Sequence, residues 1–123
     1  MRAFSLLALV ALSIAPAWAA PTTSTGRISV TQVMEMVQRA RTDATARNTV
    51  VAYLAGIGET AGLMAAEAVA RGATPLKCTN SFNLSEDVAL SALSEGAPDT
   101  ASWAETPATP IILADLFARA GCR

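Results

Sequence analysis

The 123-residue chain is 52% hydrophobic and carries a formal net charge of −1, from nine basic and ten acidic residues. That charge is too small and too evenly mixed for the basic surface on which nucleic acids or anionic membranes bind. The chain contains no histidine, which excludes the usual general base and the commonest zinc and haem ligand together.

The N-terminus has the layout of a cleavable signal peptide. Met1-Arg2 is followed by an apolar run over residues 3–15 and by Ala-Trp-Ala at residues 17–19, which fits the A-x-A cleavage pattern. The run is shorter than the roughly 20 residues that a membrane-spanning helix needs. We therefore predict a signal peptide over residues 1–19, cleaved near Ala19. The mature chain is then periplasmic or secreted and has no membrane span.

The mature chain has the length of a single domain. Residues 20–28 are polar, contain Pro and Gly, and show no apolar period, so they are predicted to be a flexible lead-in. Residues 29–123 form the domain. Two cysteines, Cys78 and Cys122, remain after cleavage. An even cysteine count in an exported chain predicts a disulfide, and two free thiols are the alternative.

A first helix is predicted from about Ser29. Ser29 and Gln32 have the spacing of a capping box, with Ile28 and Val33 as the hydrophobic staple across it. Apolar residues then recur at helical spacing: Val30, Val33, Met34 and Val37. The pattern weakens over residues 42–48, where Thr, Asp and Asn side chains compete for backbone hydrogen bonds.

The second and longest helix is predicted from about Thr49 to Arg71, ended by Gly72. Its inward stripe repeats at steps of four and three residues: Val50, Leu54, Ile57, Ala61, Met64 and Ala68. Each internal glycine costs roughly 0.8–1 kcal/mol relative to Ala, which predicts close approach of a neighbouring helix at Gly56, Gly58 and Gly62. Glu59 and Glu67 disfavour a membrane span. We expect a centrally buried helix of a soluble protein.

Two shorter helices complete the predicted domain. The third has Ser85 as its N-cap and Glu86 and Asp87 in its first turn, and it ends at Gly96; its inward residues are Val88, Ala92 and Leu93. The last begins at one of two Thr-Pro pairs, Thr106 or Thr109, and ends at Gly121; its apolar stripe is Ile112, Leu113, Leu116, Phe117 and Ala120. The sequence therefore predicts an all-α fold, a small bundle of about four helices stapled by one disulfide.

No arrangement of residues points to catalysis, a cofactor or a metal. The two cysteines are expected to be oxidised, and the spacing of Glu59 and Glu67 does not demand a paired-carboxylate hydrolase. We predict that the protein is not an enzyme and uses no cofactor or metal. An enzyme subunit or accessory factor without its own chemistry is an open alternative.

Trp103 is the best candidate for an interface anchor, because it lies outside the strongest helical periods and exposed aromatic residues are frequent hot spots. Asp99, Ser102 and Glu105 would form a polar rim around it. Packing in the core or at its edge is the alternative for Trp103, as it is for Tyr53.

The order of these motifs resembles the Rap/Tai family, the periplasmic immunity proteins of type VI secretion. The resemblance covers about residues 30–122. It rests on Tyr-Leu-Ala-Gly-Ile at residues 53–57 in the long helix, Cys78 in the next connection, and Pro-Ile-Ile-Leu-Ala-Asp-Leu at residues 110–116 leading to Cys122. Members often carry a further cysteine where this chain has Asn48 and Thr49, and their loop cysteine is commonly followed by Pro.

The resemblance implies a small, helical, disulfide-bonded and often dimeric protein that binds a peptidoglycan amidase effector and blocks its active site. The expected partner is therefore a protein, and a homodimer is expected alongside it. The alternative is a small periplasmic acid-stress chaperone of the HdeA-like type, also helical with one disulfide. Because the chain has no histidine, carboxylates would have to sense the pH in such a chaperone.

Overall fold

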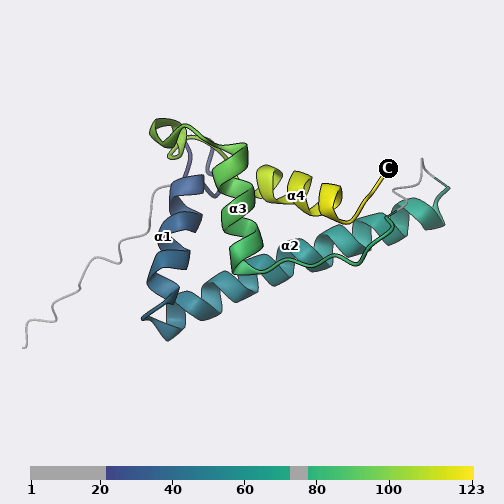
Figure 1. The fold of residues 1–123 in the computed structure, drawn as a ribbon, viewed down its shortest axis with the longest axis horizontal. Helices are drawn as coiled ribbons and strands as arrows, with labels where there is room; N and C mark the ends of the chain where they lie inside the picture. The colour runs from purple at the N-terminus through teal and green to yellow at the C-terminus, as the bar shows by residue number, and fades with distance from the viewer. Residues whose placement is uncertain (1–21, 73–77) are drawn as a thin grey trace, which may run out of the picture.

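The computed structural model describes residues 22–72 and 78–123, so the predicted signal peptide lies outside the described residues. Within them the chain forms α1 (Val30–Ala40), α2 (Ala44–Ala70), α3 (Glu86–Gly96), the short 3-10 helix η1 (Thr100–Ser102) and α4 (Ala108–Arg119). α1 and α3 stand side by side, and α2 runs beneath them and past the end of α4 (Figure 1). The predicted all-α fold with one disulfide is confirmed.

Part of the predicted lead-in forms a hydrogen-bonded turn. Thr23 is buried, its N–H donates to the Arg27 carbonyl, and its hydroxyl accepts from the Arg27 N–H at 3.1 Å. The Ser24 N–H donates to the Glu105 carboxylate at 3.0 Å. The last of these bonds joins the segment to a residue far along the chain.

α1 begins behind Ser29, as predicted. The Ser29 hydroxyl accepts a hydrogen bond from the Gln32 N–H at 3.1 Å. The reciprocal half of the capping box does not form, since Gln32 Oε1 is buried without a hydrogen-bond partner. The inward face of the helix is closely packed, with four buried residues: Val30, Val33, Val37 and Ala40.

A short antiparallel bridge between Ser29 and Pro107 joins the entries of α1 and α4. In it the Val30 N–H donates to the Thr106 carbonyl and the Ala108 N–H donates to the Ile28 carbonyl, both at 2.9 Å. The backbone at the start of each helix thus supplies part of the capping of the other.

The predicted threonine cap of the last helix is wrong. α4 begins at Ala108 without a side-chain cap. Both candidate hydroxyls form other hydrogen bonds: Thr106 donates to the Ser102 carbonyl at 2.8 Å, and Thr109 lies 2.9 Å from the Tyr53 hydroxyl. The bridge to α1 takes the place of the missing cap.

α2 begins at Ala44, earlier than the predicted start at Thr49. The Asp43 carboxylate accepts a hydrogen bond from the Thr45 N–H at 2.8 Å and caps the helix. Such a cap contributes about 1 kcal/mol, which offsets the weak helix propensities of the Thr and Asn residues that follow. Gly72, with a left-handed φ of 60°, follows the end of the helix as predicted.

Only one side of α2, mostly in its N-terminal half, is packed. Its buried residues are Val50, Leu54, Ile57, Ala61 and Ala65. Met64, predicted inside, is 60% exposed, and only 28% of the most apolar window of α2 is buried. The prediction of a centrally buried helix is therefore wrong. The reason is length: α1 and α4 have 11 and 12 residues, whereas α2 has 27 and extends about 40 Å.

The glycines of α2 do not mark a close helix contact, so this prediction is wrong as well. A Cβ added at Gly56, Gly58 or Gly62 would meet nothing within 4 Å. The close contact lies between α3 and α4, where a Cβ at Gly96 would collide with the Ile111 side chain.

α3 has the predicted cap and first turn. The Ser85 hydroxyl accepts from the Val88 N–H at 3.3 Å, and Glu86 and Asp87 follow at the positive end of the helix dipole. Val88 is half-buried, and the buried residues are Ala89, Ala92 and Leu93. The core lies where all four helices meet, and its largest fully buried side chains are Leu93, Ile112, Leu116, Val30, Val33 and Val50.

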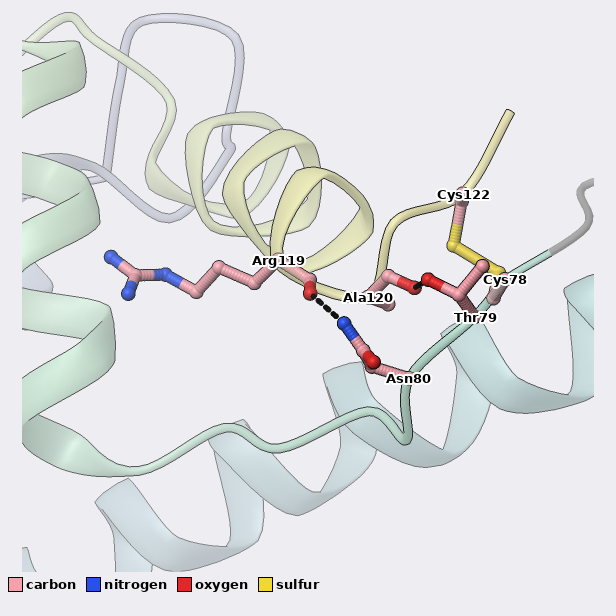
Figure 2. Close-up of a disulfide and its surroundings, with 6 residues drawn as sticks. All are labelled: Cys78, Thr79, Asn80, Arg119, Ala120 and Cys122. Atoms are coloured by element: carbon pink, nitrogen blue, oxygen red, sulfur yellow. Dashed lines mark hydrogen bonds between the residues drawn. A yellow bond between two sulfur atoms is a disulfide. The ribbon is translucent and has the colours of Figure 1, made fainter.

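The predicted disulfide joins Cys78, in the segment after α2, to Cys122, past the end of α4 (Figure 2). Beside it the N–H groups of Thr79 and Asn80 both donate to the Ala120 carbonyl at 2.9 Å. The Asn80 side chain donates to the last carbonyl of α4 at 3.1 Å. The segment after α2 therefore caps the C-terminus of α4, whose last carbonyls have no partner within the helix.

Candidate functional site

The C-terminal half of α2 presents large apolar side chains to solvent. Leu63 is 72% exposed, Met64 60% and Val69 58%, and Val51 nearer the start of the helix is 56% exposed. Single exposed apolar residues are common, but several together on one helix mark a surface that another molecule covers. This part of α2 is the candidate functional site.

A hollow of about 410 Å³ lies between α2 and α4, next to these side chains. Its lining is apolar apart from three hydroxyl groups and includes no charged residue: Ala52, Tyr53, Gly56, Ile57, Thr60 and Met64 from α2, and Thr109 and Leu113 from α4. A site of this composition suits apolar groups with few polar atoms.

Tyr53 and Thr109 form the polar contact of this hollow. Their hydroxyl oxygens are 2.9 Å apart, so one of them donates to the other. Burial raises the pKa of Tyr53, and the hydrogen bond to Thr109 opposes this shift. Tyr53 is therefore protonated at neutral pH and can offer a hydrogen bond but not a negative charge.

A second hollow of about 520 Å³ continues along α2 toward its C-terminus. It is lined by Leu63, Met64, Glu67, Ala68 and Arg71, and shares Met64 with the first. The two hollows therefore adjoin at Met64, and we call the α2 residues that line them, from Ala52 to Arg71, the α2 apolar face.

Trp103, the predicted interface anchor, is half-buried and packs against the core. Its indole N–H donates to the Ala97 carbonyl at 2.7 Å, and its own carbonyl accepts from the Thr31 N–H at 3.3 Å. The ring also forms one wall of a hollow of about 300 Å³ between α1 and α3. Trp103 thus has a role in the fold, and a role in binding stays a prediction.

The predicted rim residues are exposed and each takes part in local hydrogen bonds. Asp99 accepts from the Ala101 N–H at 3.0 Å and caps η1, and the Ser102 hydroxyl donates to the Asp99 carbonyl at 2.8 Å. The bond from Ser24 holds the pKa of the Glu105 carboxyl below its ordinary value. These residues order the loop around Trp103, and their contact with a partner also stays a prediction.

Within residues 22–72 and 78–123, no three His, Cys, Asp or Glu side chains lie close enough together to hold a metal ion. The hollow between α2 and α4 contains hydroxyl groups, and no charged side chain is among the described residues that line it. What this arrangement can do chemically is bind an apolar surface.

The sequence interpretation missed Leu63 and Val69 and assigned Met64 to the core. A signal was present: α2 is apolar on nearly every side, and by length and composition alone it is the one helix in the described part of the chain that could cross a membrane. A helix that is apolar all round is typical of complete burial. The short neighbouring helices leave this one half covered instead.

No protein-family model, curated protein or solved structure matches the chain. The α2 apolar face and the disulfide are therefore interpreted from their own chemistry, and the Rap/Tai resemblance stays a prediction from the residues that carry it.

Proposed function

We propose that this protein is exported, binds a protein partner through the α2 apolar face, and acts as an immunity-type inhibitor of a cell-wall amidase without catalysis of its own. The observation that carries the binding role is the exposure of Leu63 and Met64, which both line the α2 apolar face. Covering apolar surface contributes about 25 cal/mol per Å². A protein that packs on this face therefore gains free energy from side chains that the fold leaves in water.

Two features support export. The first 19 residues have the layout of a signal peptide. The Cys78–Cys122 bond is of the kind that persists in oxidising compartments such as the periplasm.

The amidase as the partner rests on the Rap/Tai resemblance. Two of the segments that carry it, residues 53–57 and 110–116, are far apart in the chain, and Tyr53, Gly56 and Ile57 of the first and Leu113 of the second line the same hollow. The hydrogen bond between Tyr53 and Thr109 joins the first segment to the residue just before the second. Resembling segments that meet at one candidate surface support a shared binding role more than segments dispersed over the fold would.

Inhibition is measured as loss of peptide release from purified peptidoglycan by a type VI amidase effector of the same cell. We expect activity to fall steeply up to one molar equivalent of this protein, and a complex to elute together in gel filtration. Leu63→Asp places a charge at the centre of the face and should abolish both effects. Glu86→Gln on α3, away from the face, should retain them. Full amidase activity in the presence of excess wild-type protein, with no complex, contradicts the proposal.

The acid-stress chaperone is the second candidate, favoured by the eight acidic residues within residues 48–118. Protonating these carboxylates at low pH would leave the chain strongly positive and loosen it, and more apolar surface would become available. Light scattering of an aggregating client at about pH 3 tests this function. Suppression of aggregation at that pH, together with no effect on any amidase, would favour the chaperone.

A further inference from the structure

Charge is distributed unevenly along the chain. Residues 48–118 contain eight acidic and two basic residues, whereas residues 22–47 contain two acidic and four basic ones. Most of α2, all of α3 and most of α4 therefore belong to a stretch with an excess of acidic residues, which Arg119 and Arg123 follow. A field of one sign attracts partners of the opposite sign and speeds their association.

Leu63, the most exposed large apolar side chain, lies between two acidic residues. Glu59 and Glu67 are four residues before and after it, which places the three side chains along one side of α2, a turn apart. Both glutamates are exposed. This surface matches an apolar side chain that is flanked by basic ones.

Glu67 is paired with Arg71 within α2, but the pair leaves it available to a partner. The two side chains are 59% and 76% exposed. Exposed pairs of this kind contribute at most about 1 kcal/mol. A basic side chain of a bound partner can therefore replace Arg71 or join it.

The shape of the α2 apolar face favours a helix as the bound element. Its two hollows share Met64 and run from Ala52 to Arg71 along a single helix, a length of about 28 Å at 1.5 Å per residue. A surface of that length along one helix matches an amphipathic helix of about five turns.

We infer that the α2 apolar face binds a basic amphipathic helix of the partner protein. The apolar side chains of that helix cover Leu63 and Met64, and its Lys or Arg side chains lie beside Glu59 and Glu67. The inference rests on the proposed function, because it states the chemistry of the partner's contact surface.

The same charges disfavour a second copy of this chain on the face. Glu59 and Glu67 are equally spaced about Leu63, so two α2 helices packed antiparallel about Leu63 would place Glu59 of one copy opposite Glu67 of the other. Parallel packing would place each glutamate opposite the same glutamate of the other copy. A membrane is disfavoured as well, because anionic headgroups repel these carboxylates and hydrocarbon does not solvate them.

Two synthetic helical peptides of about 18 residues test the inference. They share the same leucine positions, and one has lysine and the other glutamate on its polar face. Fluorescence anisotropy measures the binding of each peptide to the full chain. We expect the lysine peptide to bind, more weakly as salt rises, and the glutamate peptide not to bind. Leu63→Ser should weaken binding about tenfold or more. Glu59→Gln/Glu67→Gln should weaken it about threefold to tenfold at low salt and flatten its salt dependence.

The matched control is Glu86→Gln/Glu95→Gln, which removes the same charge from α3 and should change the affinity by less than about twofold. Circular dichroism verifies that each variant is folded. Three results overturn the inference: equal weakening by the control pair, equal binding of both peptides, and a wild-type dimer in sedimentation that Leu63→Ser dissociates.

The amidase assay separates this inference from the proposed function. If the amidase is inhibited, Leu63→Ser inhibits it equally well and the lysine peptide does not compete, the inference and the assignment of the α2 apolar face fail, and only the amidase-inhibitor role stands. If the lysine peptide binds as expected but no amidase is inhibited, the inference stands and the amidase role fails.

Discussion

The two halves of α2 have similar apolar composition but differ in how well their large apolar side chains are covered. Leu54 and Ile57 in the N-terminal half are 5% and 7% exposed, whereas Leu63 and Met64, less than two turns further on, are 72% and 60% exposed. The neighbours differ: α1 and α4 reach about 17 Å each and cover only part of the 27-residue helix. An apolar stripe therefore predicts which side chains can be buried. The lengths of the neighbouring helices determine which of them are buried.

Removing the disulfide has the largest expected effect, and it tests whether the exposed half of α2 depends on that bond. The bond closes a loop of 44 residues, for which the chain-entropy relation gives about 4 kcal/mol. We expect Cys78→Ser/Cys122→Ser to lose about 3–4 kcal/mol of unfolding free energy in urea. Hydrogen exchange should become faster at Thr79 and Asn80 and stay unchanged at Leu63 and Met64. Equal stability with and without a reducing agent would contradict the prediction.

A matched pair of leucines tests the comparison directly. Leu54→Ala leaves a cavity in the core and should cost about 3 kcal/mol of unfolding free energy. Leu63→Ala, in the same helix, removes a side chain that is mostly in water and should cost less than about 0.5 kcal/mol. Urea denaturation of the two variants measures the difference. Similar losses would mean that Leu63 is covered in solution, for example by a second copy.

Replacing single glycines by alanine should change the stability by less, and in opposite directions in the two regions. Gly62→Ala has open space around the new Cβ and should stabilise the protein by about 0.5–1 kcal/mol through helix propensity. Gly96→Ala forces the new methyl group against Ile111 and should destabilise it by about 1–3 kcal/mol. Thermal unfolding by circular dichroism resolves both. A loss in Gly62→Ala would reveal a close contact on the exposed half of α2.

The smallest expected effect concerns the boundary between the halves, where Tyr53 meets Thr109. Burial raises the pKa of Tyr53 in the folded protein above the ordinary value of 10.0. The resulting stability is fully present below pH 10 and is lost as the pH rises through the folded-state pKa. Since Tyr53 is the only tyrosine, tyrosinate absorbance reports it alone. The titration midpoint should be above 10 in buffer and fall toward 10 in urea, and coinciding midpoints would contradict a buried hydroxyl.

Features that depend on local chemistry could be predicted from the sequence. Ser29 and Ser85 cap their helices because a short side-chain oxygen can accept from the N–H group three residues ahead. Cys78 and Cys122 pair because the predicted compartment favours the bond. The all-α fold follows from helical periodicity with little strand alternation.

Features that depend on distant partners could not be predicted. Thr106 and Thr109 have the right type and position to cap α4, but Ser102 and Tyr53 compete for their hydroxyls. Leu63 shares a side of α2 with the exposed Glu59 and Glu67, so its exposure follows from the helical period. The exposure of Met64, which belongs to the predicted inward stripe, depends on how far the neighbouring helices extend. The candidate site was missed for the same reason, because it is defined by what the rest of the fold leaves uncovered.

The Cys78–Cys122 bond has a consequence for how the molecule unfolds. Because the disulfide closes residues 78–122 into a covalent ring, α3 and α4 are enclosed together, while α1 and α2 form a hairpin outside it. The hairpin docks on the ring through side-chain packing, the bridge at Ser29 and Pro107, and the Tyr53–Thr109 bond. Partial opening can therefore separate hairpin from ring without breaking a covalent bond, as two cooperative units of unequal resistance.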